Sequence, residues 1–318
     1  MKDTITKRLD QVQKLSGEYL SENPPAPRSV KIELSPRCNY RCAFCGILSR
    51  EKQPKEDMEL DFFKKITRDM MDSGVEEIGP FLIGEPFLNP DLHVEAIRYL
   101  KSELRVPYVF LTSNASLAFP DRVEAYMQAG LDSLKWSCNS ATPEQFISLT
   151  GMPSDLFDWV NENIKMARKI RDDGGFKTRL YASSIHFNES QPWEMKTMLD
   201  ENILPYVDEH YWLPLYSMGG MATKREAELG YKPIGGNTGR YDAPVDPIPC
   251  WPLFTVGHVL FDGRLTACCS DPTGDWVVGD LRTQSFMEAW NSMKFIELRT
   301  AHLRGNILGS KCEKCVLY

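Results

Sequence analysis

The sequence has little of what membrane, secreted and nucleic-acid-binding proteins contain. No apolar run is long enough to span a bilayer, and the first residues, MKDTITKR, lack the apolar core of a signal peptide. There is no block of Lys and Arg, and the formal net charge of −7 argues against a nucleic-acid surface. We therefore expect a cytoplasmic protein with no membrane and no nucleic-acid partner, whose thiols stay reduced. In that setting its nine cysteines suggest metal ligands rather than disulfides.

Three of these cysteines lie close together in residues 35–45, SPRCNYRCAFC. Cys38, Cys42 and Cys45 are separated by three residues and then by two. The irons of a 4Fe–4S cluster are normally each held by a Cys thiolate, so three ligands leave one iron open for a small molecule. Zinc usually takes four ligands, as paired CxxC motifs or CxxC with two His, and the histidine nearest in sequence is His93. A zinc site and buried free thiols are the alternative interpretations.

A repeating strand–helix pattern begins at residue 30. The pattern predicts strands at 30–34, 77–83, 108–111, 133–136, 178–185 and 207–213, with helices at 60–71, 92–102, 120–129, 157–170 and 192–199. Strands separated by helices of this length predict a parallel sheet, with functional residues at the carboxyl ends of the strands. Six units are fewer than the eight of a full TIM barrel. Before them, the apolar spacing predicts a helix over residues 3–21, which ends before a proline-rich turn.

The three-cysteine run, including Phe44 before its last cysteine, resembles the signature of the radical S-adenosylmethionine (SAM) enzymes. The resemblance implies an α/β fold with a partial (β/α)6 TIM-like barrel over residues 30–213. An N-terminal helical extension at 1–29 would precede the barrel, and a linker at 214–249 would follow it. The resemblance also implies that Cys38, Cys42 and Cys45 hold a 4Fe–4S cluster whose open iron binds SAM.

The ends of the predicted strands suggest the rest of the SAM pocket. The family has a Gly-Gly-Glu-Pro turn after its second strand, and this chain has Ile83 in place of the first glycine. Many relatives also have an arginine for the SAM carboxylate near Thr150, so we expect that cation from elsewhere, such as Arg179. An ordinary turn is the alternative at each strand end, because Gly, Pro, Ser and Asn are common turn residues. The cofactor-binding residues that the resemblance implies, besides Phe44, are Gly84, Glu85, Pro86, Ser113, Asn114 and Ser137.

A second set of cysteines lies in the C-terminal part of the chain. Its surroundings resemble the SPASM or twitch domain, so we predict a small auxiliary iron–sulfur domain over residues 250–318. Four thiolates complete a cluster and leave no open iron, and a structural zinc site is the alternative. Cys269 and Cys138 are each interpreted as a buried thiol, a hydrogen-atom donor or, for Cys269, another ligand. The ligands that the resemblance implies for an auxiliary 4Fe–4S cluster are Cys250, Cys268, Cys312 and Cys315.

Together these resemblances imply a radical SAM enzyme that forms a 5′-deoxyadenosyl radical for hydrogen abstraction. A closed auxiliary cluster favours oxidation, that is, dehydrogenation of a small sugar-like or nucleotide-linked substrate. The expected protein partner is a one-electron reductase such as flavodoxin or ferredoxin. The alternatives are radical epimerisation with a thiol donor, peptide modification, which the short leader disfavours, and a non-catalytic iron–sulfur electron carrier. The candidates for a catalytic base are Asp271, Arg240, Glu189 and His186.

Overall fold

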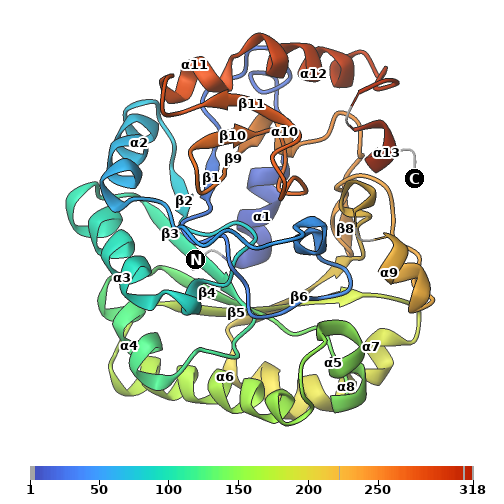
Figure 1. The fold of residues 1–318 in the computed structure, drawn as a ribbon. Coiled ribbons are helices and arrows are strands. Elements are labelled where there is room, and N and C mark those ends of the chain that lie inside the picture. Colours follow the sequence, from blue (N-terminus) through green and yellow to red (C-terminus); the bar gives the residue numbers. More distant parts are fainter. Residues whose placement is uncertain (1–3, 222, 311, 317–318) are drawn as a thin grey trace.

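The computed structural model describes residues 4–221, 223–310 and 312–316. Its main feature is a nine-stranded sheet with the strand order β11-β10-β9-β1-β2-β3-β4-β5-β6 (Figure 1). Strands β1 to β6 are parallel and adjacent in chain order, which confirms the predicted partial TIM-like barrel. These strands are β1 Ser29–Ile32, β2 Glu77–Gly79, β3 Tyr108–Ser113, β4 Ser133–Ser137, β5 Arg179–His186 and β6 Glu209–Pro214.

Helices connect the strands and cover the outer face of the sheet (Figure 1). Alternate strand residues such as Val30, Ile32 and Trp136 are fully buried in the core. Because successive strand residues point to opposite faces, the residues between them point into the barrel. The connecting helices are α2 Leu60–Asp72, α3 Pro90–Arg98, α4 Pro120–Gln128, α5 Pro143–Thr150, α6 Asp155–Asp173, α7 Gln191–Glu194 and α8 Lys196–Met198.

The C-terminal segment continues the same sheet. β9 Val256–Val259 pairs in parallel with β1, which places His258 beside Lys31. β10 Arg264–Thr266 and β11 Val277–Asp280 then add an antiparallel hairpin. The remaining elements of this half of the chain are α9 Thr223–Glu228, β7 Gly239–Arg240, β8 Ala243–Pro244, α10 Pro252–Thr255, α11 Phe286–Trp290, α12 Met293–Leu303 and α13 Glu313–Val316.

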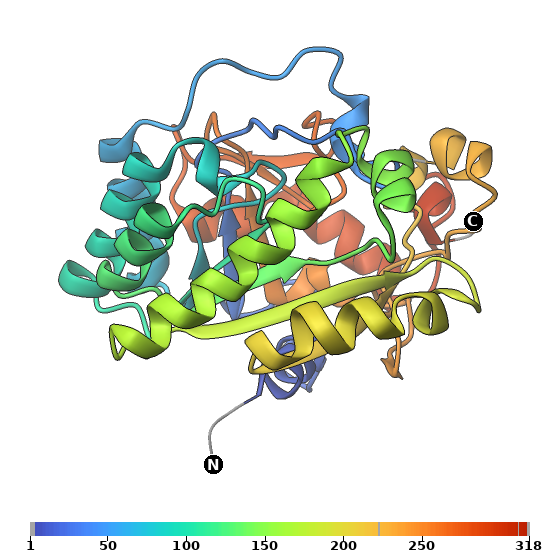
Figure 2. The same cartoon turned by 90° about the horizontal axis from the view of Figure 1, so that it is seen from below.

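The N-terminal helix α1 Ile5–Gln13 lies beneath the barrel, as Figure 2 shows. Its Arg8 forms an ion pair with Glu77, at the start of β2. The same guanidinium lies 3.4 Å from the ring centroid of Tyr108, at the start of β3. The helix therefore covers the amino ends of the strands and leaves the carboxyl ends for the site.

The prediction of a helix over residues 3–21 is wrong beyond Gln13. Nη1 of Arg28 donates hydrogen bonds to the carbonyl oxygens of Gln11 and Lys14, at 2.9 and 2.6 Å. These bonds satisfy carbonyl groups at the end of the helix, which otherwise have no intrahelical donor. The contact joins residues 14 and 17 positions apart, and the local apolar spacing does not reveal it.

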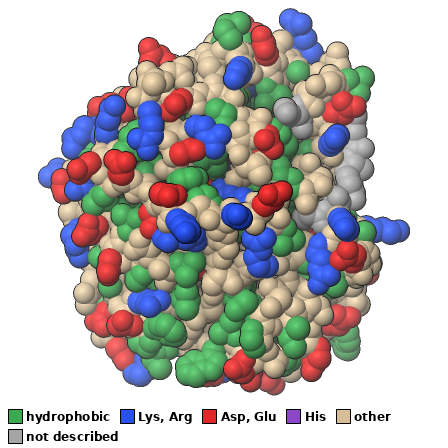
Figure 3. Space-filling model, in the orientation of Figure 1, with side chains coloured by type: hydrophobic (Ala, Val, Ile, Leu, Met, Phe, Trp, Pro, Cys, Tyr) green, Lys and Arg blue, Asp and Glu red, His purple; other side chains and the backbone are tan. Residues whose placement is uncertain are grey.

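Figure 3 shows Lys, Arg, Asp and Glu side chains interspersed over the face that Figure 1 presents. In the described parts of the chain, no helix combines the length and apolar character that a bilayer span requires.

Candidate active site: two cysteine-lined cavities

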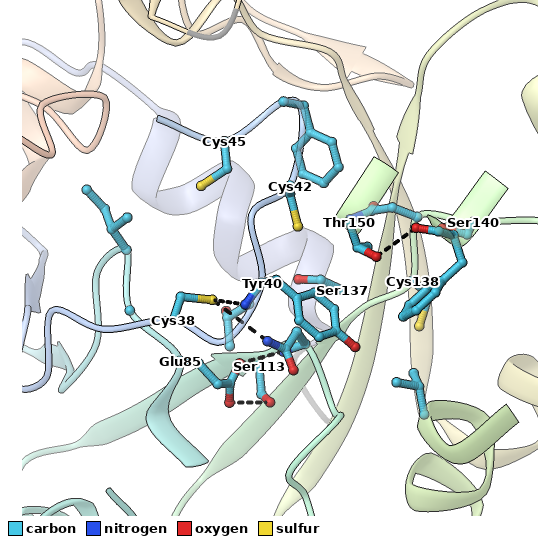
Figure 4. A pocket seen from close by; sticks show the side chains of 18 of the residues that line it. Cys38, Tyr40, Cys42, Cys45, Glu85, Ser113, Ser137, Cys138, Ser140 and Thr150 are labelled. Atoms are coloured by element: carbon cyan, nitrogen blue, oxygen red, sulfur yellow. Dashed lines mark hydrogen bonds between the residues drawn. The ribbon is translucent and has the colours of Figure 1, made fainter. Parts of the chain in front are cut away.

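The first cavity lies at the carboxyl ends of the barrel strands and has a volume of about 190 Å³. Figure 4 shows Cys38, Cys42 and Cys45 on one loop, with Glu85 and Ser113 on neighbouring segments. The structure thus brings together residues from seven separate parts of the sequence. The predicted site residues that line this cavity are Cys38, Cys42, Phe44, Cys45, Gly84, Glu85, Ser113, Asn114, Ser137 and Cys138, together with Ile83 and Thr150.

The three-cysteine loop is held by backbone contacts with the end of α5. The amide of Ala43 donates to the carbonyl of Leu149 at 2.7 Å, and that of Arg41 donates to Thr150 at 3.3 Å. Both acceptors are terminal helix carbonyls, which need a partner outside the helix. At the start of the loop, the amide group of Gln53 bonds both the amide and the carbonyl of Cys38, at 2.7 and 2.9 Å. These contacts fix the loop independently of any ligand.

Gly84 has a steric reason to be glycine. A Cβ atom at this position would lie 2.0 Å from the carbonyl oxygen of Ser35 and 2.9 Å from that of Arg37. The next amide, that of Glu85, donates to the Arg37 carbonyl at 2.7 Å. The turn after β2 therefore packs directly on the backbone that leads into the first cysteine. Sequence reasoning interpreted this glycine as part of the cofactor pocket or of an ordinary turn, and it did not predict this contact with the cysteine loop.

Glu85 is buried, and its carboxylate joins the ends of β2 and β3. It accepts hydrogen bonds from the Ser113 hydroxyl at 2.7 Å, the Asn114 amide at 2.8 Å and the Phe87 amide at 3.1 Å. Burial raises its pKa to about 7, although these three donors favour the charged form. Pro86, the next residue, is buried behind this turn and is not among the residues that line the cavity. Its carbonyl accepts from the Tyr126 hydroxyl at 3.0 Å.

The chemistry of the donor set fits an iron–sulfur cluster. Burial raises the pKa of Cys38 to about 12 and raises the pKa values of Cys42 and Cys45 as well. Thiolates in such surroundings need a compensating positive charge, which bound iron ions supply. All three thiols are free.

A second cavity, of about 220 Å³, is lined by five further cysteines. Cys268 and Cys269 follow β10, whereas Cys312 and Cys315 lie at α13. The fifth, Cys250, precedes α10, and its amide donates to Nδ1 of His302 at 3.2 Å. The cavity therefore gathers the four predicted auxiliary ligands and adds Cys269 to them.

Residues of the 214–249 segment support α13. The amide of Gly236 donates to the carbonyl of Cys315 at 2.7 Å. A Cβ atom on Gly235 would lie 2.6 Å from the carbonyl oxygen of Val316, so this close approach requires glycine. The segment predicted as a linker thus holds one side of the second cavity.

None of the proposed bases lines either cavity. Glu189 is exposed, and the ring of His186 stacks on that of Tyr241 with centroids 3.9 Å apart. Arg240 forms ion pairs with Asp10 at 3.0 Å and Asp242 at 2.6 Å.

Asp271 is fully buried and accepts hydrogen bonds from the amides of Asp275 and Trp276, both at 2.8 Å. It also accepts one from the Thr266 hydroxyl. These contacts make it a support for the loop after β10. Arg179 was expected to pair with the SAM carboxylate, and that expectation is wrong. It is the first residue of β5, at the end of the strand away from the cavity, and pairs with Asp208 at 3.5 Å.

Three charged residues that sequence reasoning missed lie between or beside the cavities. Arg50 is buried and pairs with Glu33, while Lys31 and Lys135 line the second cavity from β1 and β4. A signal for the lysines was present, because each is a charged residue in the middle of a predicted buried strand. Arg50 gave no such signal, since it lies in an irregular loop.

The barrel and its two sets of thiols define an iron–sulfur enzyme built on an α/β barrel. The chain belongs to the Radical SAM superfamily, whose family model matches residues 32–194. A second model, described as an iron–sulfur cluster-binding domain and named SPASM, matches residues 250–316. The predicted family and cofactors are thereby confirmed: a 4Fe–4S cluster, SAM and an auxiliary cluster. Within the described residues, no three or more His, Cys, Asp or Glu side chains converge on a single metal ion. A 4Fe–4S cluster does not require such an arrangement, because each of its irons is held by one thiolate.

Curated relatives match about half of this chain or less. A probable GTP 3′,8-cyclase of Methanococcus maripaludis is 32% identical over 127 residues, covering 39% of this chain and 40% of the relative. The GTP 3′,8-cyclase of Chlorobaculum tepidum is 28% identical over 186 residues, covering 52% and 54%. An AdoMet-dependent heme synthase of Methanosarcina barkeri is 32% identical over 148 residues, covering 45% and 40%. The chain thus spans about half or less of the length of these relatives.

Solved structures share the fold over most of the chain. SuiB of Streptococcus suis bound to the precursor peptide SuiA has a TM-score of 0.64 and 15% identity, covering 85% of this chain and 66% of that chain. BtrN in complex with AdoMet and 2-DOIA has a TM-score of 0.55 and 13% identity, covering 90% and 91%. At these identities the similarity establishes the fold.

Proposed function

We propose that this radical SAM enzyme oxidises a small, sugar-like or nucleotide-linked substrate by hydrogen-atom abstraction. The observation that carries the proposal is the presence of two separate thiol sets in one barrel: three on one loop at the first cavity, which Cys138 also lines, and five at the second cavity. A set of three fits a cluster with an open iron, whereas four thiolates close a cluster completely. The two sets therefore suit two different tasks.

In this proposal Cys38, Cys42 and Cys45 hold the SAM-binding cluster; the cluster would supply one electron, and SAM would supply the 5′-deoxyadenosyl radical that abstracts the hydrogen atom. The chain positions that chemistry. Glu85 fixes the ends of β2 and β3 beside the cavity, and Asn114 and Ser137 add polar groups to its wall. The enclosing barrel excludes water and holds the reacting groups in one geometry.

Oxidation of an alcohol removes a hydrogen atom, an electron and a proton, so an electron acceptor is needed besides the abstractor. The auxiliary ligand set, Cys250, Cys268, Cys312 and Cys315, suits an acceptor because it leaves no iron open for substrate. We propose flavodoxin or ferredoxin as the reductase, in the reducing setting of the cytosol.

Support for a small-molecule substrate comes from the BtrN structure, which holds 2-DOIA and whose match spans 90% of this chain. The SuiB structure holds a precursor peptide, so a peptide substrate is the competing case to test.

Radical epimerisation is a second candidate because of Cys138. This residue follows β4 and lines the first cavity. Burial raises the pKa of its thiol to about 12, which keeps the S–H group intact at neutral pH. An intact thiol beside the reaction space is suited to return a hydrogen atom to a substrate radical.

The test uses reconstituted protein, a one-electron reductant, SAM and deuterated candidate sugars or nucleotide sugars. Oxidation predicts deuterium in 5′-deoxyadenosine and a product that has lost two hydrogens. If the reaction is run in D₂O, solvent deuterium in a product that is an isomer of the substrate would instead indicate epimerisation. Absence of any 5′-deoxyadenosine from freshly reconstituted, reduced protein would contradict both.

A further inference from the structure

Lys31 and Lys135 place two ammonium groups inside the barrel. Lys31 is the third residue of β1 and Lys135 the third of β4, and both line the second cavity. Nζ of Lys135 donates to the Tyr211 hydroxyl at 3.2 Å. Nζ of Lys31 lies 5.9 Å from the ring centroid of Phe81. A hydroxyl and an aromatic face are weak partners for two enclosed cations.

Within the described ranges, no carboxylate forms an ion pair with either lysine. Two carboxylates near the amino ends of the strands, those of Glu77 and Glu209, are already engaged by α1. Glu77 pairs with Arg8, and Glu209 accepts from the backbone amide of Ile5 at 2.7 Å. Buried charges are normally paired, so the missing counter-charge points to a ligand.

The lysines lie where the two cavities meet. Lys135 is the register partner of Thr112 on β3, and Thr112 lines the first cavity. Ser137, two residues further along β4, also lines the first cavity. Two strand residues span about 6.6 Å, roughly the size of a sugar ring. A group held at Lys135 therefore lies about that far from the wall of the first cavity at Ser137. Phe81, beside Lys31, lines the first cavity as well.

We propose that Lys31 and Lys135 together bind an anionic group of the substrate, a phosphate ester or a carboxylate. The substrate would enter with its reacting carbon toward the three-cysteine cavity and its anionic group toward the lysines. This inference rests on the proposed function and adds to it the charge of the substrate. Burial lowers the pKa of Lys135 to about 8, and a bound anion would favour its charged form.

The competing explanation is that the lysines only balance the negative charge of an auxiliary cluster. The placement of Lys135 argues against it, because this residue lies at the level of Thr112 and close to the wall of the first cavity. Its Nζ donates to the hydroxyl of Tyr211, which also lines the second cavity. A measurement that separates anion binding from cluster potential decides between the two explanations.

The experiment measures binding of inorganic phosphate and of ¹³C-labelled malonate to reconstituted, reduced protein. Reduced clusters are paramagnetic, so a bound anion shows shortened ³¹P or ¹³C relaxation. We expect Lys135→Met and Lys31→Met each to weaken binding about tenfold or more, since each removes a charge-assisted hydrogen bond. Lys135→Arg keeps the charge and should retain binding. Lys169→Met, on an exposed part of α6, is the matched control.

Shortened phosphate relaxation alone would assign a phosphate ester, and shortened malonate relaxation alone would assign a carboxylate. The inference is overturned if both Met variants bind the anions as the unmodified protein does, or if the unmodified protein binds neither. It is also overturned if the variants change only the auxiliary-cluster potential in a redox titration. Formation of 5′-deoxyadenosine from SAM, measured on the same preparations, tests the proposed function separately.

Discussion

Arg50 connects the two halves of the site, and replacing it by Met should destabilise both. Its Nη2 lies 3.0 and 2.9 Å from the carboxylate oxygens of Glu33. Nη1 donates to the carbonyl of Pro36 at 2.8 Å, and Nε donates to that of Pro272 at 2.6 Å. Pro36 precedes the first cysteine loop, and Pro272 follows the cysteines after β10. One guanidinium thus joins the residue after β1, the three-cysteine loop and the segment that follows Cys268 and Cys269.

The magnitude follows from the burial of the pair. The side chains of Arg50 and Glu33 are only 5% and 0% exposed. Burial already raises the pKa of Glu33, and the Arg50 charge opposes that rise. Without Arg50, Glu33 must become protonated or stay charged without a partner. Breaking a buried pair in this way costs about 3–5 kcal/mol. Anaerobic urea unfolding of reconstituted Arg50→Met protein, with iron counting, measures this cost and the loss of iron at both sites.

A double-mutant cycle tests the reasoning. Combining Glu33→Gln with Arg50→Met should lower the free energy of unfolding by clearly less than the sum of the two single changes. Each single change leaves one buried charge without its partner, whereas the double variant removes both charges. Lys169→Met is the control, since its pair with Asp173 is more than 60% exposed on both sides and such pairs are worth about 0.5 kcal/mol or less. A cost for Arg50→Met below about 1 kcal/mol, or strictly additive changes, would refute the account.

Three further changes test other parts of the structure. Gly84→Ala should lower the iron content by about four per chain, because its Cβ collides with the cysteine loop, whereas Gly17→Ala, with nothing within 4 Å, should not. Burial raises the pKa of Glu77 to about 7 from 4.5, so the folded state binds this proton more tightly than the unfolded state does. The free energy of unfolding should therefore fall by up to about 3 kcal/mol as pH rises between these values. In Glu77→Gln, the difference between the unfolding free energies at pH 5 and pH 8 should be smaller by this amount. Cys138→Ala should keep its full iron content, whereas Cys312→Ala should lose about four irons per chain. If the two variants contained the same amounts of iron and sulfide, the ligand assignment would be contradicted.

Much of the barrel was predictable because its signals are local. Each predicted strand begins within two residues of an observed one, since apolar runs and the helices between them follow from the nearest neighbours in sequence. The cysteine spacing likewise lies within one loop. The described structure places all seven predicted cluster cysteines at two cavities, three of them predicted from their spacing and four from the resemblance of their surroundings to a SPASM or twitch domain.

The features that escaped prediction depend on contacts between distant parts of the chain. Gly84 meets the backbone at Ser35, and Arg50 meets Pro272, 222 residues later. Helix α5 was not predicted, although its last carbonyls hold the cysteine loop. Hydrogen bonds of this kind leave no periodic trace in the sequence, because nothing about one segment specifies which other segment it will meet.

The pairing of β9 with β1 explains why the two thiol sets lie in one barrel. Lys31 lies between Gly79 on β2 and His258 on β9, so β1 belongs to the barrel and to the C-terminal segment at once. The loop after β1 carries the three cysteines, while β10 runs back antiparallel and brings Cys268 toward the amino ends of the strands. The barrel interior therefore brings the two cavities close together, since Lys135 lines the second and its register partner Thr112 lines the first. A substrate held in that interior would face both sites without any movement of one domain against another.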